Sequence, residues 1–120
     1  MRIGELAELT GISRRSLRYY EQRGLLHATR TDSGWREYDE EAVMRARNVR
    51  DLIGAGLSID DIQRIAPCLD KDLSDGPACR EAIEMYQDRL AEVDRRIAVF
   101  TNHRDQLEQR IKELRERSTE

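Results

Sequence analysis

Apolar residues recur at alternating intervals of three and four through the C-terminal part of the chain. One polar residue, Arg104, interrupts the series, whose members are Ile83, Tyr86, Leu90, Val93, Ile97, Phe100, Leu107, Ile111 and Leu114. This is the a and d stripe of a heptad repeat, and residues 78–117 contain neither Gly nor Pro. We therefore predict a helix over 78–117, roughly 55–60 Å long at ~1.5 Å per residue.

Such a helix carries more apolar surface than a small neighbouring domain can cover. We expect most of the stripe to pack against a second copy of the helix in a coiled coil. The alternative is a long helix docked along its own domain. Arg104 either fixes the register of the pair or extends its charged end to the edge of the interface.

Two short helices separated by a tight turn are predicted at the N-terminus. Gly11 supplies the turn because glycine tolerates a positive φ, and Ser13 is a suitable N-cap for a second helix over 13–23. We expect Leu17 to lie in the core and Tyr20 to be more buried than its neighbour. The first helix has a predicted apolar face formed by Ile3, Leu6, Ala7 and Leu9. This is the outline of a helix-turn-helix.

A second pair of helices repeats this outline further along the chain. Asp39 is the expected N-cap of the third helix, and Ser58 with Asp61 resembles a capping box that opens the fourth. Pro67 is expected to end the fourth helix. The positions predicted to face inward are Val43, Ala46, Val49, Leu52, Ile53, Ile59, Ile62 and Ile65.

A turn cluster over residues 31–34 lies between the two pairs, flanked by short extended segments. A hairpin that directly follows the second helix of a helix-turn-helix is a wing. The predicted fold is therefore mainly α, with a winged helix-turn-helix head and its second helix pair over 1–66. A linker over 67–77, the coiled-coil helix over 78–117 and a tail over 118–120 complete the chain.

The net charge is −3, but the charges are unevenly distributed. Residues 14–36 hold six Arg against Glu21 and Asp32, a net of +4. A local patch of this kind, rather than the total charge, sets the potential for binding phosphates. The charge pattern fits a nucleic-acid surface and equally a solvated charged face.

Several classes of protein are disfavoured by the sequence. No apolar run approaches the ~18 residues of a membrane span, and no signal peptide is apparent, so we expect no membrane partner and a cytoplasmic location. Two cysteines make no disulfide framework. A glycine-rich phosphate loop, a cluster of metal ligands and a nucleophile with its base are all missing, which argues against an enzyme.

Four motifs stand in a specific order. Arg18-Tyr19-Tyr20-Glu21 is followed by Gly24-Leu25-Leu26, then by Arg36 with Tyr38, and then by Gly56-Leu57-Ser58. In this combination the chain resembles the MerR family of bacterial transcription regulators over nearly its whole length. The resemblance implies a dimer whose long helices pair antiparallel. It also implies an operator within an overlong promoter spacer, which the dimer bends and untwists for RNA polymerase.

The expected DNA contacts come from the second helix and the wing. The helix offers Arg14, Arg15 and Arg18 to the major groove, and the family pattern adds Tyr19. In the wing, Arg36 is the best phosphate contact and Arg30 a weaker one. Tyr38 is a further candidate through its hydroxyl, and Trp35 either packs on the DNA backbone or stiffens the hairpin. Three arginines of the third helix either reach phosphates or form a solvated face: Arg45, Arg47 and Arg50.

The sequence predicts double-stranded DNA as the partner and no cofactor. Cys79 is a weak candidate for metal or redox sensing, because a thiophilic metal needs further soft ligands that the residues after it do not supply. His103 is given no role, and the sequence leaves any role of Cys68 open. The leading function is a promoter-specific regulator, and the alternative is an architectural DNA-bending or coiled-coil interaction protein.

Overall fold

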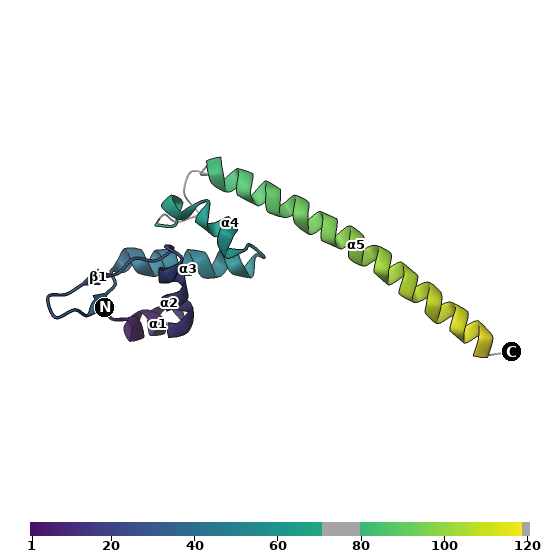
Figure 1. Cartoon of the computed structure of the whole chain (residues 1–120), viewed down its shortest axis with the longest axis horizontal. Coiled ribbons are helices and arrows are strands. Elements are labelled where there is room, and N and C mark those ends of the chain that lie inside the picture. The colour runs from purple at the N-terminus through teal and green to yellow at the C-terminus, as the bar shows by residue number, and fades with distance from the viewer. Residues whose placement is uncertain (71–79, 119–120) are drawn as a thin grey trace. The chain divides into compact units, whose positions relative to one another are not determined.

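The computed structural model describes residues 1–70 and 80–118 of the chain. It contains the helices α1 (Ile3–Thr10), α2 (Arg14–Gln22), α3 (Glu40–Gly54), α4 (Ile59–Gln63) and α5 (Arg80–Ser118), the 3-10 helix η1 (Ala66–Cys68), and the strands β1 (Thr29–Arg30) and β2 (Arg36–Glu37) (Figure 1). The chain divides into two units, Met1–Met85 and Tyr86–Glu120. The mainly helical fold with a small hairpin confirms the prediction.

The turn between α1 and α2 forms as the sequence predicts. Gly11 has a φ of 72°, and its N–H donates to the carbonyl of Ala7 at 2.9 Å. The hydroxyl of Ser13 accepts a hydrogen bond from the backbone N–H of Ser16 at 3.1 Å, which caps α2. Leu6 and Leu17 are fully buried, so the two helices pack across the core.

The apolar face of α1 is rotated from the predicted one. Leu9 is 54% exposed, and Thr10 takes the inward position instead. The hydroxyl of Thr10 donates to the carbonyl of Leu6 at 2.8 Å and accepts from the N–H of Ile12 at 3.2 Å, so its burial leaves no polar atom unpaired. Helical geometry explains the choice, since position 10 lies nearer than position 9 to the direction of Leu6.

Local caps also begin α3 and α4. The carboxylate of Asp39 accepts from the N–H of Ala42 at 3.0 Å. Ser58 and Asp61 exchange two side-chain hydrogen bonds of 3.1 Å, which confirms the capping box. Their inward faces are largely as predicted, with the exception of Ile53, which is 39% exposed.

The arginines of α3 hold backbone carbonyls of the same unit, a role that the sequence did not suggest. Arg45 is buried, and its Nε donates to the carbonyl of Leu25 at 2.9 Å. Arg47 donates to the carbonyl of Leu9 at 3.0 Å, and Arg50 donates to that of Thr10. Two guanidinium groups thus satisfy the C-terminal carbonyls of α1, where the helix dipole favours positive charge.

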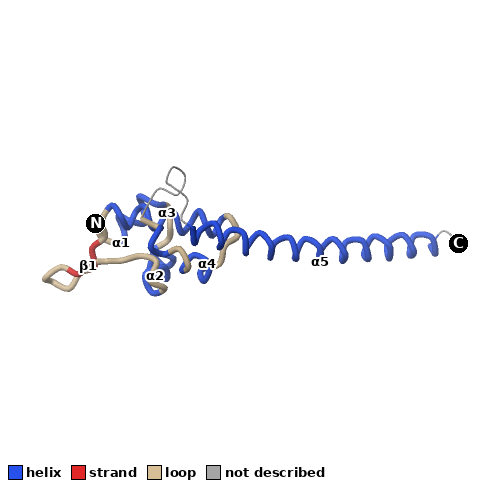
Figure 2. Tube along the Cα trace, turned by 90° about the horizontal axis from the view of Figure 1, so that it is seen from above, coloured by secondary structure: helices blue, strands red, loops and turns tan. Residues whose placement is uncertain are grey.

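The wing is a two-stranded antiparallel ribbon that pairs Thr29 with Glu37 and Arg30 with Arg36. Gly34, with a φ of 84°, closes the turn by donating to the carbonyl of Thr31 at 2.9 Å. Figure 2 shows the ribbon and its loop extending beyond the neighbouring helices. Because loop and strands lie at the periphery, their side chains are available to a partner.

The core of the first unit includes residues on both sides of the undescribed segment 71–79. Leu69, which falls in the predicted linker, is fully buried, as is Met85 of α5. Ala82 of α5 belongs to the same core cluster. The predicted helix start at residue 78, and Cys79, lie outside the described residues. Within them, α5 runs to Ser118, close to the predicted end.

Candidate nucleic-acid interface

The outer face of α2 forms one surface hollow. Its volume is ≈550 Å³, and it is lined by Arg15, Ser16, Arg18, Tyr19 and Gln22. Tyr19 is 42% exposed there, whereas Tyr20 is 7% exposed on the core side. This difference confirms the predicted division of the two tyrosines. The helix therefore presents two guanidinium groups and a phenol to solvent on one face.

A second hollow joins α2 to the wing. Its volume is ≈390 Å³, and four arginines line it: Arg2, Arg18, Arg30 and Arg36. The other lining residues are Ile3, Gly34, Trp35 and Tyr38, none of which carries a carboxylate, and the carboxylate of Glu21 contacts Arg36 from outside the lining. Arg18 lines both hollows, which places it between the helix face and the wing. Four guanidinium groups around one open hollow favour the approach of an anion.

The strand register places two arginines opposite one another in the wing. Arg30 and Arg36 pair directly across the ribbon, and residues in that relation project to the same side. Like charges opposite one another destabilise a hairpin. The carboxylate of Glu21 offsets part of this repulsion at Arg36, and a bound anion would offset more of it.

Glu21 of α2 connects the wing to the helix. One of its carboxylate oxygens accepts from the hydroxyl of Tyr38 at 3.0 Å, and the other lies 3.4 Å from Nε of Arg36. Tyr38 itself is 3% exposed. The hydroxyl that we expected at a phosphate is therefore directed to Glu21 in this structure. Its backbone also binds Met1, with the N–H of Tyr38 donating to the carbonyl of Met1 at 2.7 Å.

Burial is the largest cause that raises the pKa of Tyr38 above its ordinary value of 10, and the hydrogen bond to Glu21 adds to it. The neutral phenol is thus favoured in the folded state. Its contribution to stability is complete below pH ~10 and is lost as the pH rises through the raised pKa.

We predict that Tyr38→Phe lowers the free energy of unfolding by about 1–3 kcal/mol at neutral pH, because a buried hydrogen bond to a carboxylate is lost. The difference between the wild-type protein and the variant should shrink above pH ~10. Urea unfolding followed by circular dichroism from pH 7 to 11 measures it. Tyr20, whose pKa burial also raises, is present in both proteins and cancels. A difference that stays constant with pH would contradict this assignment.

Two contacts of the head were not anticipated from the sequence. The guanidinium carbon of Arg2 lies 4.4 Å from the ring centroid of Trp35, a cation–π contact that holds Trp35 against the N-terminal segment. Trp35 remains 55% exposed. Arg14 lies over α1, where a Cβ built on Gly4 would come within 2.8 Å of its terminal nitrogen. Glycine at position 4 therefore makes room for Arg14.

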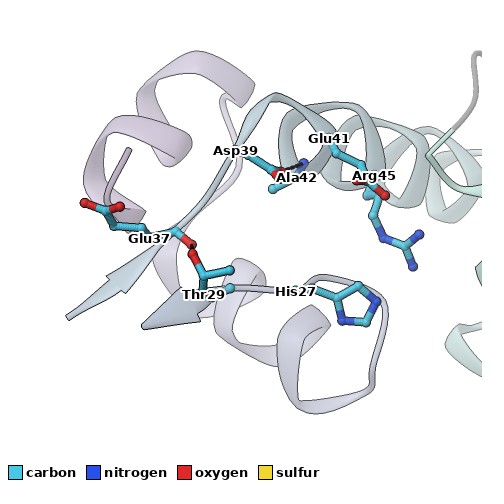
Figure 3. A pocket seen from close by; sticks show the side chains of 8 residues that line it. His27, Thr29, Glu37, Asp39, Glu41, Ala42 and Arg45 are labelled. Carbon is cyan, nitrogen blue, oxygen red and sulfur yellow. Dashed lines mark hydrogen bonds between the residues drawn. The ribbon is translucent and has the colours of Figure 1, made fainter. Parts of the chain in front are cut away.

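A third, smaller hollow lies behind the wing. Its volume is ≈90 Å³, and His27 and Arg45 line it together with Glu37, Asp39 and Glu41 (Figure 3). Asp39 is occupied as the N-cap of α3. Within 1–70 and 80–118 there is no group of three or more His, Cys, Asp or Glu side chains that could hold a metal ion. The small volume and mixed charges distinguish this hollow from the two arginine-lined ones.

The predicted heptad stripe lies on the surface of α5. Ile83 and Tyr86 are 46% and 43% exposed, and Leu90, Ile97 and Phe100 are 61%, 57% and 67% exposed. Leu107, Ile111 and Leu114 are exposed to a similar degree, and Val93 is partly exposed. Arg104 pairs with Glu108 along the helix at 3.3 Å. Of the helices in the described residues, none is long and apolar enough to cross a membrane.

Comparison with known proteins identifies two matching family profiles. The profile described as MerR HTH family regulatory protein matches residues 1–67, and the profile described as MerR, DNA binding matches residues 43–109. The regulator HmrR of Rhizobium leguminosarum is 34% identical over 109 residues, which is 90% of this chain and 81% of that protein. The nodulation protein NolA of Bradyrhizobium elkanii is 36% identical over 107 residues, which is 88% of this chain and 44% of its own length. The chain thus spans less than half of that relative.

Solved structures agree with these matches. A transcription regulator from Ralstonia metallidurans in complex with lead(II) has a TM-score of 0.75, with 25% identity over 89% of this chain and 81% of that chain. A MerR family regulator that lacks the sensor domain, bound to promoter DNA, has a TM-score of 0.59, with 25% identity over 88% of this chain and 78% of that chain. With both profiles matched and the same fold found, the chain belongs to the MerR family of regulatory proteins.

Proposed function

We propose that this protein is a sequence-specific transcription regulator that binds double-stranded DNA as a dimer. The observation that carries the proposal is the hollow lined by Arg2, Arg18, Arg30 and Arg36, with no carboxylate among its described residues. It adjoins the exposed face of α2 through Arg18. The helix α2 can enter the major groove and contact base edges, while the wing contacts the phosphates of the adjacent backbone.

Within this interface, the roles follow from position. Arg15, Arg18 and Tyr19 lie on the exposed face of α2 and are the candidates for base and phosphate contacts in the groove. Arg30 and Arg36 of the wing, which line one hollow with Arg2, would neutralise phosphates. Trp35 is exposed next to them and packs on the backbone sugars. Arg14 remains a proposed contact, although it also packs over α1.

The dimer is proposed to form through the exposed stripe of α5, with two helices antiparallel as family resemblance implies. Two identical heads related by a twofold axis read an inverted repeat. A MerR family regulator of similar fold, solved bound to promoter DNA, lends support. Bending and untwisting of the operator would then bring promoter elements into register for RNA polymerase in the bacterial cytoplasm.

Selection of bound fragments from a random DNA pool tests this function. A regulator should enrich one inverted repeat, with an affinity for it ~10³-fold or more above that for unrelated DNA of equal length. Circular permutation of the enriched site then measures the bend. Enrichment of no common sequence, with comparable affinity for all fragments, would instead identify an architectural DNA-bending protein. If the protein binds no DNA at all, the remaining alternative is a coiled-coil interaction protein.

A further inference from the structure

Arg23, which directly follows α2, is the centre of a polar network between two helix ends. One terminal nitrogen of its guanidinium donates to the hydroxyl of Tyr19 at 3.0 Å. The other donates to the carboxylate of Asp60 in α4 at 2.7 Å and to the side-chain oxygen of Gln63 at 3.3 Å. Gln63 returns a hydrogen bond from its amide nitrogen to the carbonyl of Arg23 at 2.8 Å. The planar guanidinium therefore serves α2 and α4 at the same time.

The charge of Arg23 is already matched within the protein. Its ion pair with Asp60 is as short as a charge-assisted hydrogen bond allows, and its guanidinium also lies 5.8 Å from the ring centroid of Tyr19. The hydrogen bond to Tyr19, followed by the contact with Asp60, raises the pKa of Arg23 above its ordinary value. A neutralised arginine of this kind is poorly suited to release counterions from DNA, in contrast to Arg30 of the wing.

The contact with Arg23 determines what the Tyr19 hydroxyl can offer to a ligand. Because the oxygen accepts from Arg23, its own hydrogen points elsewhere, and no residue within 1–70 or 80–118 accepts it. Tyr19 is 42% exposed and lines the same hollow as Arg15 and Arg18. The hydroxyl is thus arranged to donate to an acceptor outside the protein, and a phosphate oxygen is the acceptor that DNA presents most often to such a donor.

We propose that Arg23 is a positioning residue for DNA recognition, which aims the hydroxyl of Tyr19 at a phosphate and is itself held by Asp60 and Gln63. The inference rests on the proposed DNA-binding function and assigns Arg23 a part in it. It also gives the second helix pair a role in recognition, because α4 supplies both side chains that fix Arg23.

A double-mutant cycle on the selected operator tests this role. Tyr19→Phe, which removes one hydrogen bond per head, is expected to weaken binding about tenfold or more. Arg23→Met should cause a comparable loss, and the double variant should be no more than about twofold weaker than Tyr19→Phe. Losses that multiply in the double variant, or an Arg23→Met variant that binds as the wild type does, would overturn the proposal. If Arg23→Met fails to fold by circular dichroism, Arg23→Gln takes its place in the cycle.

Salt dependence separates positioning from direct contact. Arg23→Met should leave the slope of log affinity against log salt unchanged, because Arg23 touches no phosphate. Loss of a direct phosphate contact would lower the slope by ~0.9 per head, as we expect for the matched variant Arg30→Met. A slope reduced by Arg23→Met would therefore overturn the inference while leaving the DNA-binding function intact. If the wild-type protein selects no DNA, the proposed function itself is contradicted.

Discussion

Replacing Arg18 by alanine is expected to weaken binding to the selected operator by about 30- to 10⁴-fold. Arg18 lines both the α2 hollow and the wing hollow, so it lies where the two surfaces meet. A bidentate arginine contact to a base is worth ~1–3 kcal/mol, and a symmetric dimer loses it twice. A gel-shift titration at fixed salt measures the change.

Lys112→Ala provides the control for lost charge. Lys112 is exposed on α5, and its heptad position is away from the apolar stripe. This variant should bind the operator nearly as well as the wild-type protein. Sedimentation of the Arg18→Ala variant should show an intact dimer, so that the loss is assigned to the interface with DNA. Unchanged affinity for Arg18→Ala would refute α2 as the groove helix.

The second large effect is expected from Ile97→Asp, which should weaken the dimer by roughly 10²- to 10⁴-fold. Burial of an isoleucine contributes ~1.5–3 kcal/mol, and a symmetric dimer loses that contribution from both helices. An aspartate at the same position also carries a charge into an apolar interface. Sedimentation equilibrium over a range of concentrations measures the dissociation constant.

Val99→Asp is a closely matched control, because Val99 is 54% exposed in the single chain and Ile97 is 57% exposed. The two residues differ in heptad position, since Val99 lies off the stripe. If pairing follows the heptad stripe, Val99→Asp should leave the dimer almost unchanged. Equal weakening by both variants, or by neither, would contradict the proposed interface. A chain that is truncated before the heptad stripe should be monomeric.

The elements of the fold could be predicted because their determinants are local. Ser13, Asp39 and Ser58 each cap a backbone N–H within three residues, so a short stretch of sequence contains both partners. The same holds for the turn at Gly11 and for the heptad spacing of α5. Leu9 shows the limit of such patterns, because a buried threonine with both its hydrogen bonds made displaced it from the inward face.

The contacts that organise the candidate site join distant residues and could not be predicted in this way. Glu21 meets Tyr38 across 17 positions, and Arg47 reaches the end of α1 across 38. From the sequence, the arginines of the α2 and wing segment could not be distinguished from one another, because each adds the same positive charge. The structure shows that two of them, Arg23 and Arg36, pair with the carboxylates of Asp60 and Glu21, whereas Arg15 and Arg18 line the α2 hollow. Arg2 was overlooked because it lies outside the charged segment.

The carboxylate of Glu21 has a mechanical consequence for the head. By binding Tyr38 with one oxygen and approaching Arg36 with the other, it ties α2, the proposed groove helix, to the wing and its proposed backbone contacts. A head braced in this way adapts little to the local shape of its site. Where the geometry of free DNA and the spacing of these two contacts disagree, the duplex is the softer partner and takes up the strain. The protein would then select base steps beneath the head for the ease with which they deform as much as for their hydrogen-bonding groups.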